Sequence, residues 1–233
     1  MRRLITVTVA GLAMGAAVPS VAHAALPETF TPVVGHNPRW LSRAVNALEA
    51  QSQVFRRHWS SWDQVAGEAF FDVDGIPTYI GTPKELTALG QGAWVTYMEQ
   101  RCYVGIHVYR FKPEPPPHGL FVATRPKVIV LTSAQSLAKC RYRFSVKSDE
   151  ITLSHEVLET LADPKANEFN QSTFWRINKI GVEVADPVEH HGYYDSIHGA
   201  WLSDFTLPSY YLNDQHGPWD FMGVLKGPWP AHD

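Results

Sequence analysis

The sequence has only two cysteines, no run of basic residues and, after its first twenty residues, no long apolar segment. Lysine and arginine number 20 against 23 aspartates and glutamates, and this mildly acidic balance does not indicate a nucleic-acid partner. No apolar run is long enough to form a convincing membrane-spanning helix. We therefore expect a monomer with no nucleic-acid partner and no membrane span.

Two families of catalytic motif are also missing from the sequence. There is no G-x-S-x-G segment, which would place a nucleophilic serine on a strand-to-helix turn. There is no glycine-rich loop of the P-loop or Rossmann type to hold a phosphate group. These absences direct the search for chemistry toward histidine and the carboxylates.

The first 24 residues have the three parts of a secretory signal peptide. A basic start, Met1–Arg3, precedes an apolar stretch, Leu4–Val18, and the small residues of Ala22–Ala24 suit a cleavage site. We therefore expect residues 1–24 to be a signal peptide and the protein to be secreted, to the periplasm or the extracellular space. The length that remains, 25–233, suits a single domain with a substantial core.

Cys102 and Cys140 are the two cysteines, and neither has a cysteine or histidine neighbour at metal-binding spacing. An exported chain meets an oxidising compartment, so we expect the two to form a disulfide. Bridges of this kind typically stabilise a fold by ~2–4 kcal/mol.

The segment 148–164 has the pattern of a buried amphipathic helix. Leu153, Val157 and Leu161 recur every four residues and define one apolar face. Ser148 suits the N-cap, and the Asp163-Pro164 pair suits the end, because proline disfavours a helical residue before it.

This predicted helix carries the motif H-E-x-x-E. His155 and Glu159 are four residues apart, so both project from one side of the helix and can reach a single metal ion. Glu156 lies beside that position, where a general base for a metal-activated water would stand. The pattern is that of the zinc-protease motif H-E-x-x-H with glutamate in place of the second histidine, an exchange that zinc tolerates.

A second acidic motif, Glu183-x-x-Asp186-Pro187, follows downstream. Glu183 is our preferred third ligand and Asp186 its close rival. The two side chains can also divide the work, one binding the metal and the other orienting His155 through its free ring nitrogen. The other reading is structural, because an aspartate before a proline commonly begins a loop.

Together these motifs resemble the zincin superfamily of metallopeptidases, in particular the gluzincin arrangement with its downstream glutamate. The chain is still more similar to bacterial and phage proteins that carry S-H-E-x-x-E…D-P, then E-x-x-D-P, then S-D/N-F-x-x-P. Here these are Ser154–Pro164, Glu183–Pro187 and Ser203–Pro208, so the resemblance covers the C-terminal third to half of the chain. It implies a zincin-like fold and a metal-dependent hydrolytic site.

The remaining pattern predicts an α+β domain. Asn37 and Pro38 begin a long first helix that continues to Trp59. Strand-like stretches follow at 68–72, 94–99, 103–111, 120–124 and 127–132, and a short helix or connection at 133–140. From residue 165 onward the signals are those of loops packed against the first half. One long helix, a small mixed sheet and a metal-bearing helix is the order expected of a zincin-like domain.

We therefore expect a secreted metal-dependent hydrolase of a peptide or protein substrate, with a zinc ion held by His155, Glu159 and Glu183 or Asp186, and Glu156 as the base. A donor for the developing oxyanion is also needed. Candidates for it are His190, His191, Tyr193, Tyr194, Tyr210 and Tyr211. Two alternatives remain. One is a non-catalytic binding or structural protein with a closed, stabilising metal site. The other is a calcium-stabilised domain with six or more oxygen ligands.

Overall fold

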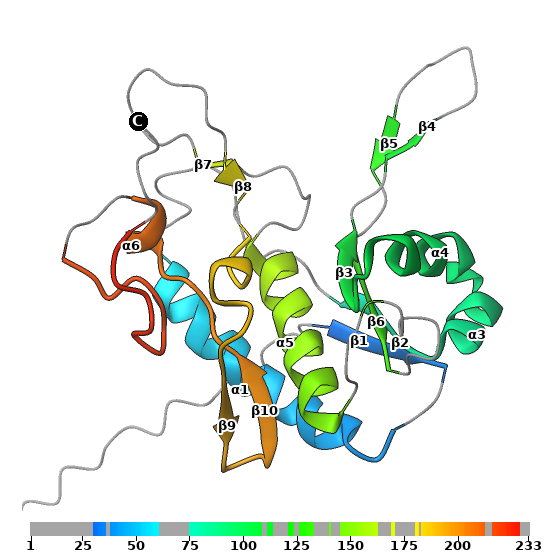
Figure 1. Ribbon diagram of the computed structural model, residues 1–233, viewed down its shortest axis with the longest axis horizontal. Helices are drawn as coiled ribbons and strands as arrows, with labels where there is room; N and C mark the ends of the chain where they lie inside the picture. Colours follow the sequence, from blue (N-terminus) through cyan, green and yellow to red (C-terminus); the bar gives the residue numbers. More distant parts are fainter. Residues whose placement is uncertain are drawn as a thin grey trace, which may run out of the picture.

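The computed structural model describes residues 30–35, 38–60, 75–108, 111–113, 121–123, 126–132, 140, 145–162, 169–170, 180–181, 183–212 and 216–228. Within them the protein is mixed α+β, as predicted (Figure 1). The expected signal peptide, the expected strand at 68–72 and most of the short helix expected at 133–140 lie outside these residues. No helix in the described part of the chain is long and apolar enough to span a membrane.

A four-stranded mixed sheet forms one layer of the molecule. Its order is β1 (Phe30–Val34), β2 (Ile76–Gly81), β6 (Lys127–Leu131) and β3 (Gly105–Val108). The first three strands run parallel, and β3 pairs antiparallel with β6 at the edge. The β-branched run of β6 is buried, as a strand covered on both faces requires. The sequence analysis predicted β6 and the core of β3 but did not predict β2.

Three shorter pairs of strands complete the sheet structure. In the antiparallel pair of β4 (Phe111–Pro113) and β5 (Phe121–Ala123), β5 falls within the predicted stretch 120–124, whereas β4 shares only Phe111 with the predicted stretch 103–111. A second small pair joins β7 (Phe169–Asn170) to β8 (Ile180–Gly181). The third is the hairpin of β9 (Gly192–Asp195) and β10 (Ala200–Ser203), which packs against the helices.

The first long helix is α1, Leu41–Trp59. It begins three residues later than predicted, because Pro38 forms a turn in which its carbonyl accepts the amide of Leu41 at 2.9 Å. The face bearing Ala44, Leu48 and Phe55 is buried. At the end of the helix, the fully buried indole of Trp59 donates to the carbonyl of Thr206 at 3.1 Å.

The strand predicted at 94–99 is wrong, because these residues lie in α4, Gly92–Arg101. The β-branched and aromatic content of this stretch favours a strand, but Val95 and Met98 are buried three residues apart, which is a helical spacing. Upstream, α3 (Pro83–Leu86) and a π-helical turn, η1 (Thr87–Gln91), lead into α4. Helix α4 ends at Cys102, whose predicted disulfide with Cys140 is present.

The helix predicted from 148–164 is α5, Val146–Ala162. It begins two residues early, because Ser145 and not Ser148 occupies the capping position. The amide of Ser148 donates to Ser145 Oγ at 3.1 Å, and the amide of Ser145 donates to Ser148 Oγ at 2.8 Å. This reciprocal pair has the geometry of a capping box.

Helix α5 lies at the centre of the molecule. The sheet is on one side of it, and α1 with the β9–β10 hairpin is on the other (Figure 1). Its apolar residues Leu153, Val157 and Leu161 are fully buried, as predicted. Loops were expected from residue 165 onward, but that part of the chain includes the β9–β10 hairpin, and only the chain beyond β10 is poor in regular structure. It contains α6 (Pro208–Tyr211) and loops that pack against α1 through aromatic rings.

Candidate metal centre

A buried hydrogen-bond network sets the orientation of α5. Ser154 Oγ donates to Gln51 Oε1 on α1 at 2.7 Å and accepts the amide of Ser203 on β10 at 2.9 Å. Gln51 Nε2 in turn donates to the carbonyl of Ser203 at 2.7 Å. This closed network fixes the rotation of α5, so the next residue, His155, projects away from α1 and toward the loop after β8.

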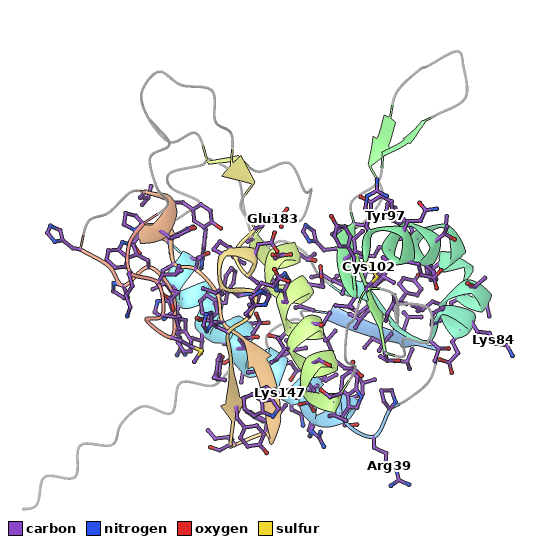
Figure 2. The ribbon with its side chains drawn as sticks, viewed as in Figure 1. Arg39, Lys84, Tyr97, Cys102, Lys147 and Glu183 are labelled. Atoms are coloured by element: carbon purple, nitrogen blue, oxygen red, sulfur yellow. A yellow bond between two sulfur atoms is a disulfide. The ribbon has the colours of Figure 1, made fainter. Side chains whose placement is uncertain are left out.

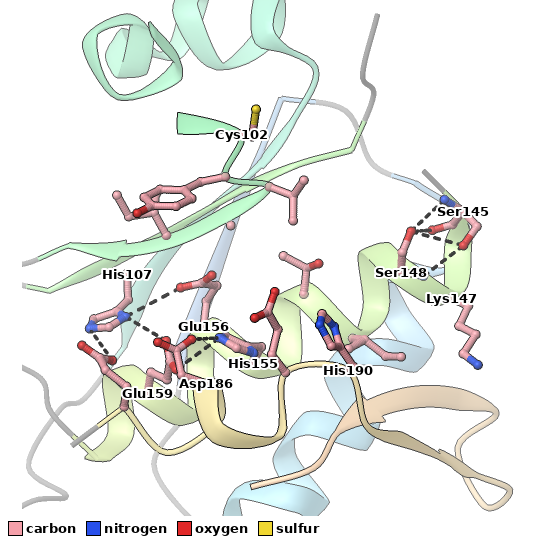
Figure 3. Close-up of a pocket in the computed structure, with 18 of the residues that line it drawn as sticks. Cys102, His107, Ser145, Lys147, Ser148, His155, Glu156, Glu159, Asp186 and His190 are labelled. Atoms are coloured by element: carbon pink, nitrogen blue, oxygen red, sulfur yellow. Dashed lines mark hydrogen bonds and ion pairs between the residues drawn. The ribbon is translucent and has the colours of Figure 1, made fainter. Parts of the chain in front are cut away.

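The predicted ligands His155 and Glu159 lie together on α5. His155 Nε2 is 3.1 Å from Glu159 Oε1 and 3.2 Å from Asp186 Oδ1 (Figure 3). Asp186 opens a short 3-10 helix, Asp186–Val188, in the loop that faces α5. Of the two rival third ligands, Asp186 is therefore the one that the fold brings to His155 and Glu159.

Glu183, our preferred third ligand, instead faces a residue that the sequence analysis did not select. Its Oε2 lies 3.7 Å from Nε2 of His107, on β3. The other ring nitrogen of His107, Nδ1, is 3.3 Å from Glu159 Oε2 and 3.6 Å from Glu156 Oε2. The site thus has a second histidine, and Figure 3 shows the carboxylates arranged around it. The available signal was a polar histidine between apolar neighbours in a predicted strand.

The loop carrying Glu183 and Asp186 is held by the chain that follows β10. Thr206 donates both its amide, at 2.7 Å, and its hydroxyl, at 2.9 Å, to the carbonyl of Val184. The hydroxyl of Tyr211 donates to the carbonyl of Glu183 at 2.9 Å. The S-D-F-x-x-P segment therefore supports the loop that bears the carboxylates.

Strand β3 touches α5 at Gly105. A Cβ atom at this position would lie 2.5 Å from Glu156 Oε1 and 2.6 Å from Thr152 Cγ2, closer than such atoms approach. Only glycine lets the strand lie this close to the helix. The same contact holds the Glu156 side chain beside His107.

The candidate metal ligands line a cavity of about 790 Å³ between β3, α5 and the 183–190 loop. The cavity runs along α5 from Glu183 to Lys147, which Figure 2 labels near the two ends of the helix. Of the six candidate oxyanion donors, His190 lines it. Tyr97 and Tyr103, which the sequence analysis did not select, contribute to the wall near the disulfide.

Tyr193, Tyr210 and Tyr211, three further candidates, have other roles in the fold. Tyr193 accepts a hydrogen bond from Gln51 at 3.3 Å, and Tyr210 and Tyr211 are buried in the core. Burial raises the pKa of Tyr193 and Tyr210 to about 12, and it raises the pKa of Tyr211 well above the usual 10. None of the three lines the cavity.

Burial and close charges act against each other in the cluster. Burial lowers the pKa of His107 and of His155, but the carboxylates around them outweigh it and raise both pKa values well above 6.5. Burial acts to raise the pKa of Glu159, but the charge of His155 and the contact with His107 lower it below its usual range. For Glu156, burial is the larger influence and raises the pKa.

The residues present fit a divalent metal ion. Two groups of three side chains each bring one ligand atom within 4.8 Å of the others: His155, Glu159 and Asp186, and His107, Glu156 and Glu159. Glu159 is only 4% exposed, and its buried Oε1 meets His155 Nε2 at 3.1 Å. His107 Nε2 is also buried, and it has no hydrogen-bond partner. Buried polar atoms are normally satisfied, so this nitrogen favours a charged partner such as a metal ion.

Comparisons with known proteins leave the function to be argued from this geometry. No protein-family model matches the chain, and neither a curated protein nor a solved structure matches it.

Proposed function

We propose that the protein is a metal-dependent hydrolase, similar to the zincin metallopeptidases, that cleaves a peptide or a related amide. The observation that carries this proposal is the convergence of His155, Glu159 and Asp186 at the wall of a cavity, with Glu156 beside them. Two of these side chains come from α5 and the third from a distant loop. The mixed α+β fold, with the motif on a central helix, agrees with a zincin-like arrangement.

The donor set favours zinc over calcium. Imidazole nitrogen and carboxylate oxygen together suit Zn²⁺, whereas Ca²⁺ requires six or more oxygen ligands. A zinc ion held by these residues would lower the pKa of a bound water and polarise the substrate carbonyl. Asp186 has a side chain that is 61% exposed, so the group is open to solvent and to a substrate.

Glu156 is the proposed general base. Its carboxylate takes a proton from the attacking water and delivers it to the leaving amine. A C–O bond forms and the C–N bond breaks, so one water is consumed and a carboxylic acid and an amine result. Burial raises the pKa of Glu156, which brings it closer to the value useful for both halves of this proton transfer.

The Cys102–Cys140 disulfide supports the expected export of the protein, because such bridges persist in oxidising compartments. It joins the end of α4 to the segment before α5 and so lies directly beside β3 and the cavity wall. The proposed substrate is therefore a peptide encountered outside the cytoplasm.

One feature favours a second candidate, a non-catalytic protein with a stabilising metal. The ligating groups come from β3, α5 and the 183–190 loop, so an ion among them would tie three separate elements together. Such an ion stabilises the fold in proportion to its binding. The alternative predicts metal-dependent thermal stability without hydrolysis.

The test is release of new amino groups from a mixture of denatured proteins by the zinc-loaded protein and its Glu156→Gln variant. We expect the variant to lose activity by about 10²–10⁴-fold, the usual contribution of a general base. It should retain the ion bound by His155, Glu159 and Asp186. Glu189→Gln is the matched control, since Glu189 is an exposed glutamate on the cavity wall outside both ligand groups. Equal activity in Glu156→Gln and wild type would exclude Glu156 as the base.

A further inference from the structure

We propose that the centre binds two divalent transition-metal ions, bridged by the carboxylate of Glu159. This inference rests on the metal site proposed above and adds a second ion to it. The second ion is held by His107, Glu156 and Glu159, on the side of α5 that faces β3.

The two oxygens of Glu159 face different histidines. Oε1 lies 3.1 Å from His155 Nε2, and Oε2 lies 3.3 Å from His107 Nδ1. The side chain is 4% exposed, so neither oxygen is directed to bulk water. A carboxylate with one imidazole at each oxygen has the arrangement of a bridging ligand between two ions.

Each histidine also has a carboxylate of its own. Asp186 Oδ1 stands 3.2 Å from His155 Nε2, and Glu156 Oε2 stands 3.6 Å from His107 Nδ1. The two ligand groups are therefore alike in composition. Each has one imidazole nitrogen, one oxygen of Glu159 and one carboxylate that the other group does not share. Four carboxylates, including Glu183, surround the two histidines, a balance that suits more than one divalent cation.

Glu183 orients His107 in this arrangement. Its Oε2 is 3.7 Å from Nε2, the ring nitrogen opposite the one that faces Glu156 and Glu159. Histidine ligands commonly direct their second nitrogen to a carboxylate, which fixes the ring and its tautomer. The downstream motif thus supplies Asp186 as a ligand of one ion and Glu183 as the positioning residue for the ligand of the other.

The role of Glu156 follows from its two oxygens. Oε2 faces His107 and ligates the second ion, while Oε1, beside Gly105, is the oxygen left to act as the base. Glu156→Gln should therefore weaken the second site and leave the first one occupied. A single-ion centre predicts instead that Glu156→Gln has no effect on metal content.

The experiment is equilibrium dialysis of the full secreted chain against Zn²⁺, followed by elemental analysis, with circular dichroism to confirm folding. We expect two equivalents in the wild type, one in His107→Ala, one in His155→Ala and two in the control His190→Ala. His190 lines the same cavity but belongs to neither ligand group. If His107→Ala does not fold, His107→Gln replaces it with the same expected loss of one equivalent.

Cobalt gives a second readout that does not depend on activity. Two Co²⁺ ions bridged by one carboxylate couple magnetically, so the signal per ion in electron paramagnetic resonance should be weaker in the wild type than in His107→Ala. One equivalent in the wild type, or two that persist in His107→Ala, overturns the two-ion proposal and leaves the hydrolase proposal standing. No bound metal in the wild type contradicts both.

Discussion

Two buried pairs of carboxylates in the described part of the chain, Asp204 with Asp220 and Glu156 with Glu159, have different partners. In the loops after β10, Asp204 Oδ1 accepts the amides of Phe205 and Met222 at 2.8 and 3.1 Å. Asp220 accepts the amides of Val224 and Leu225 at 2.7 and 2.8 Å. On α5, Glu156 and Glu159 face the side chains of His107 and His155 instead.

This difference separates carboxylates that organise turns from carboxylates that converge with side chains of other elements. Asp204 and Asp220 are fully buried and organise turns through backbone amides of their own neighbourhood. The glutamates of α5 converge with side chains from β3 and the 183–190 loop on the wall of a cavity. Burial alone therefore does not mark a candidate site, whereas burial combined with side chains that converge from several elements does.

Asp220→Ala should produce the largest loss of stability. It leaves the partly buried amides of Val224 and Leu225 without their carboxylate acceptor, and a buried group left unpaired costs about 1–3 kcal/mol. We expect the free energy of unfolding in urea to fall by several kcal/mol, while the folded variant still binds metal. If metal binding disappears in protein that remains folded, the two acidic groups are not independent.

Gly105→Ala should affect the α5 site directly. The added methyl group would meet Glu156 and Thr152, so β3 or Glu156 must move, at a cost of about 1–3 kcal/mol. Hydrolysis should fall more than the stability does, because Glu156 is displaced. Gly227→Ala is the control, since a Cβ there meets nothing within 4 Å. Unchanged activity in Gly105→Ala would show that the contact does not position Glu156.

Ser154→Ala should destabilise the protein by about 1 kcal/mol, the typical net contribution of a hydrogen bond. It removes the acceptor for Ser203 and the donor to Gln51 and so loosens α5 against α1 and β10. We expect a lower midpoint of urea denaturation and a small decrease in metal affinity. A variant as stable as the wild type would mean that packing alone orients the helix.

Asp204→Asn should change how stability depends on pH. Burial and the hydrogen bond with Asp220 raise the pKa of Asp204 from 3.8 to about 7. The folded protein therefore retains a proton that the unfolded chain releases, and this contribution to the free energy of unfolding falls as pH rises from about 4 to about 7. Asparagine stays neutral, so its denaturation curves at pH 5 and pH 7 should differ less than those of the wild type. An unchanged difference would mean that Asp204 does not carry this proton.

The sequence predicted those parts of the fold that depend on local pattern. The long helix α1, the helix α5 with its apolar face, the β-branched strand β6 and the disulfide are all confirmed. Strand β2 was not predicted, because it contains a proline and a glycine. Helix α4 was not predicted, because its aromatic residues favour a strand.

The same distinction between local pattern and tertiary packing applies to the residues of the candidate site. The spacing of His155 and Glu159 on one helix is local, so the sequence could predict their proximity. His107 reaches them through the pairing of β3 with β6 and the packing of that strand on α5, which no short motif encodes. The choice between Glu183 and Asp186 likewise depends on how Thr206 and Tyr211 hold their loop.

The most direct test of the account is the metal content of the purified protein, measured beside Glu159→Ala and Asp204→Asn. We predict bound zinc in the wild type and in Asp204→Asn, and a loss of zinc in Glu159→Ala while its circular dichroism remains native. The same zinc content in Glu159→Ala as in the wild type would contradict the assignment of the α5 carboxylates as the metal centre.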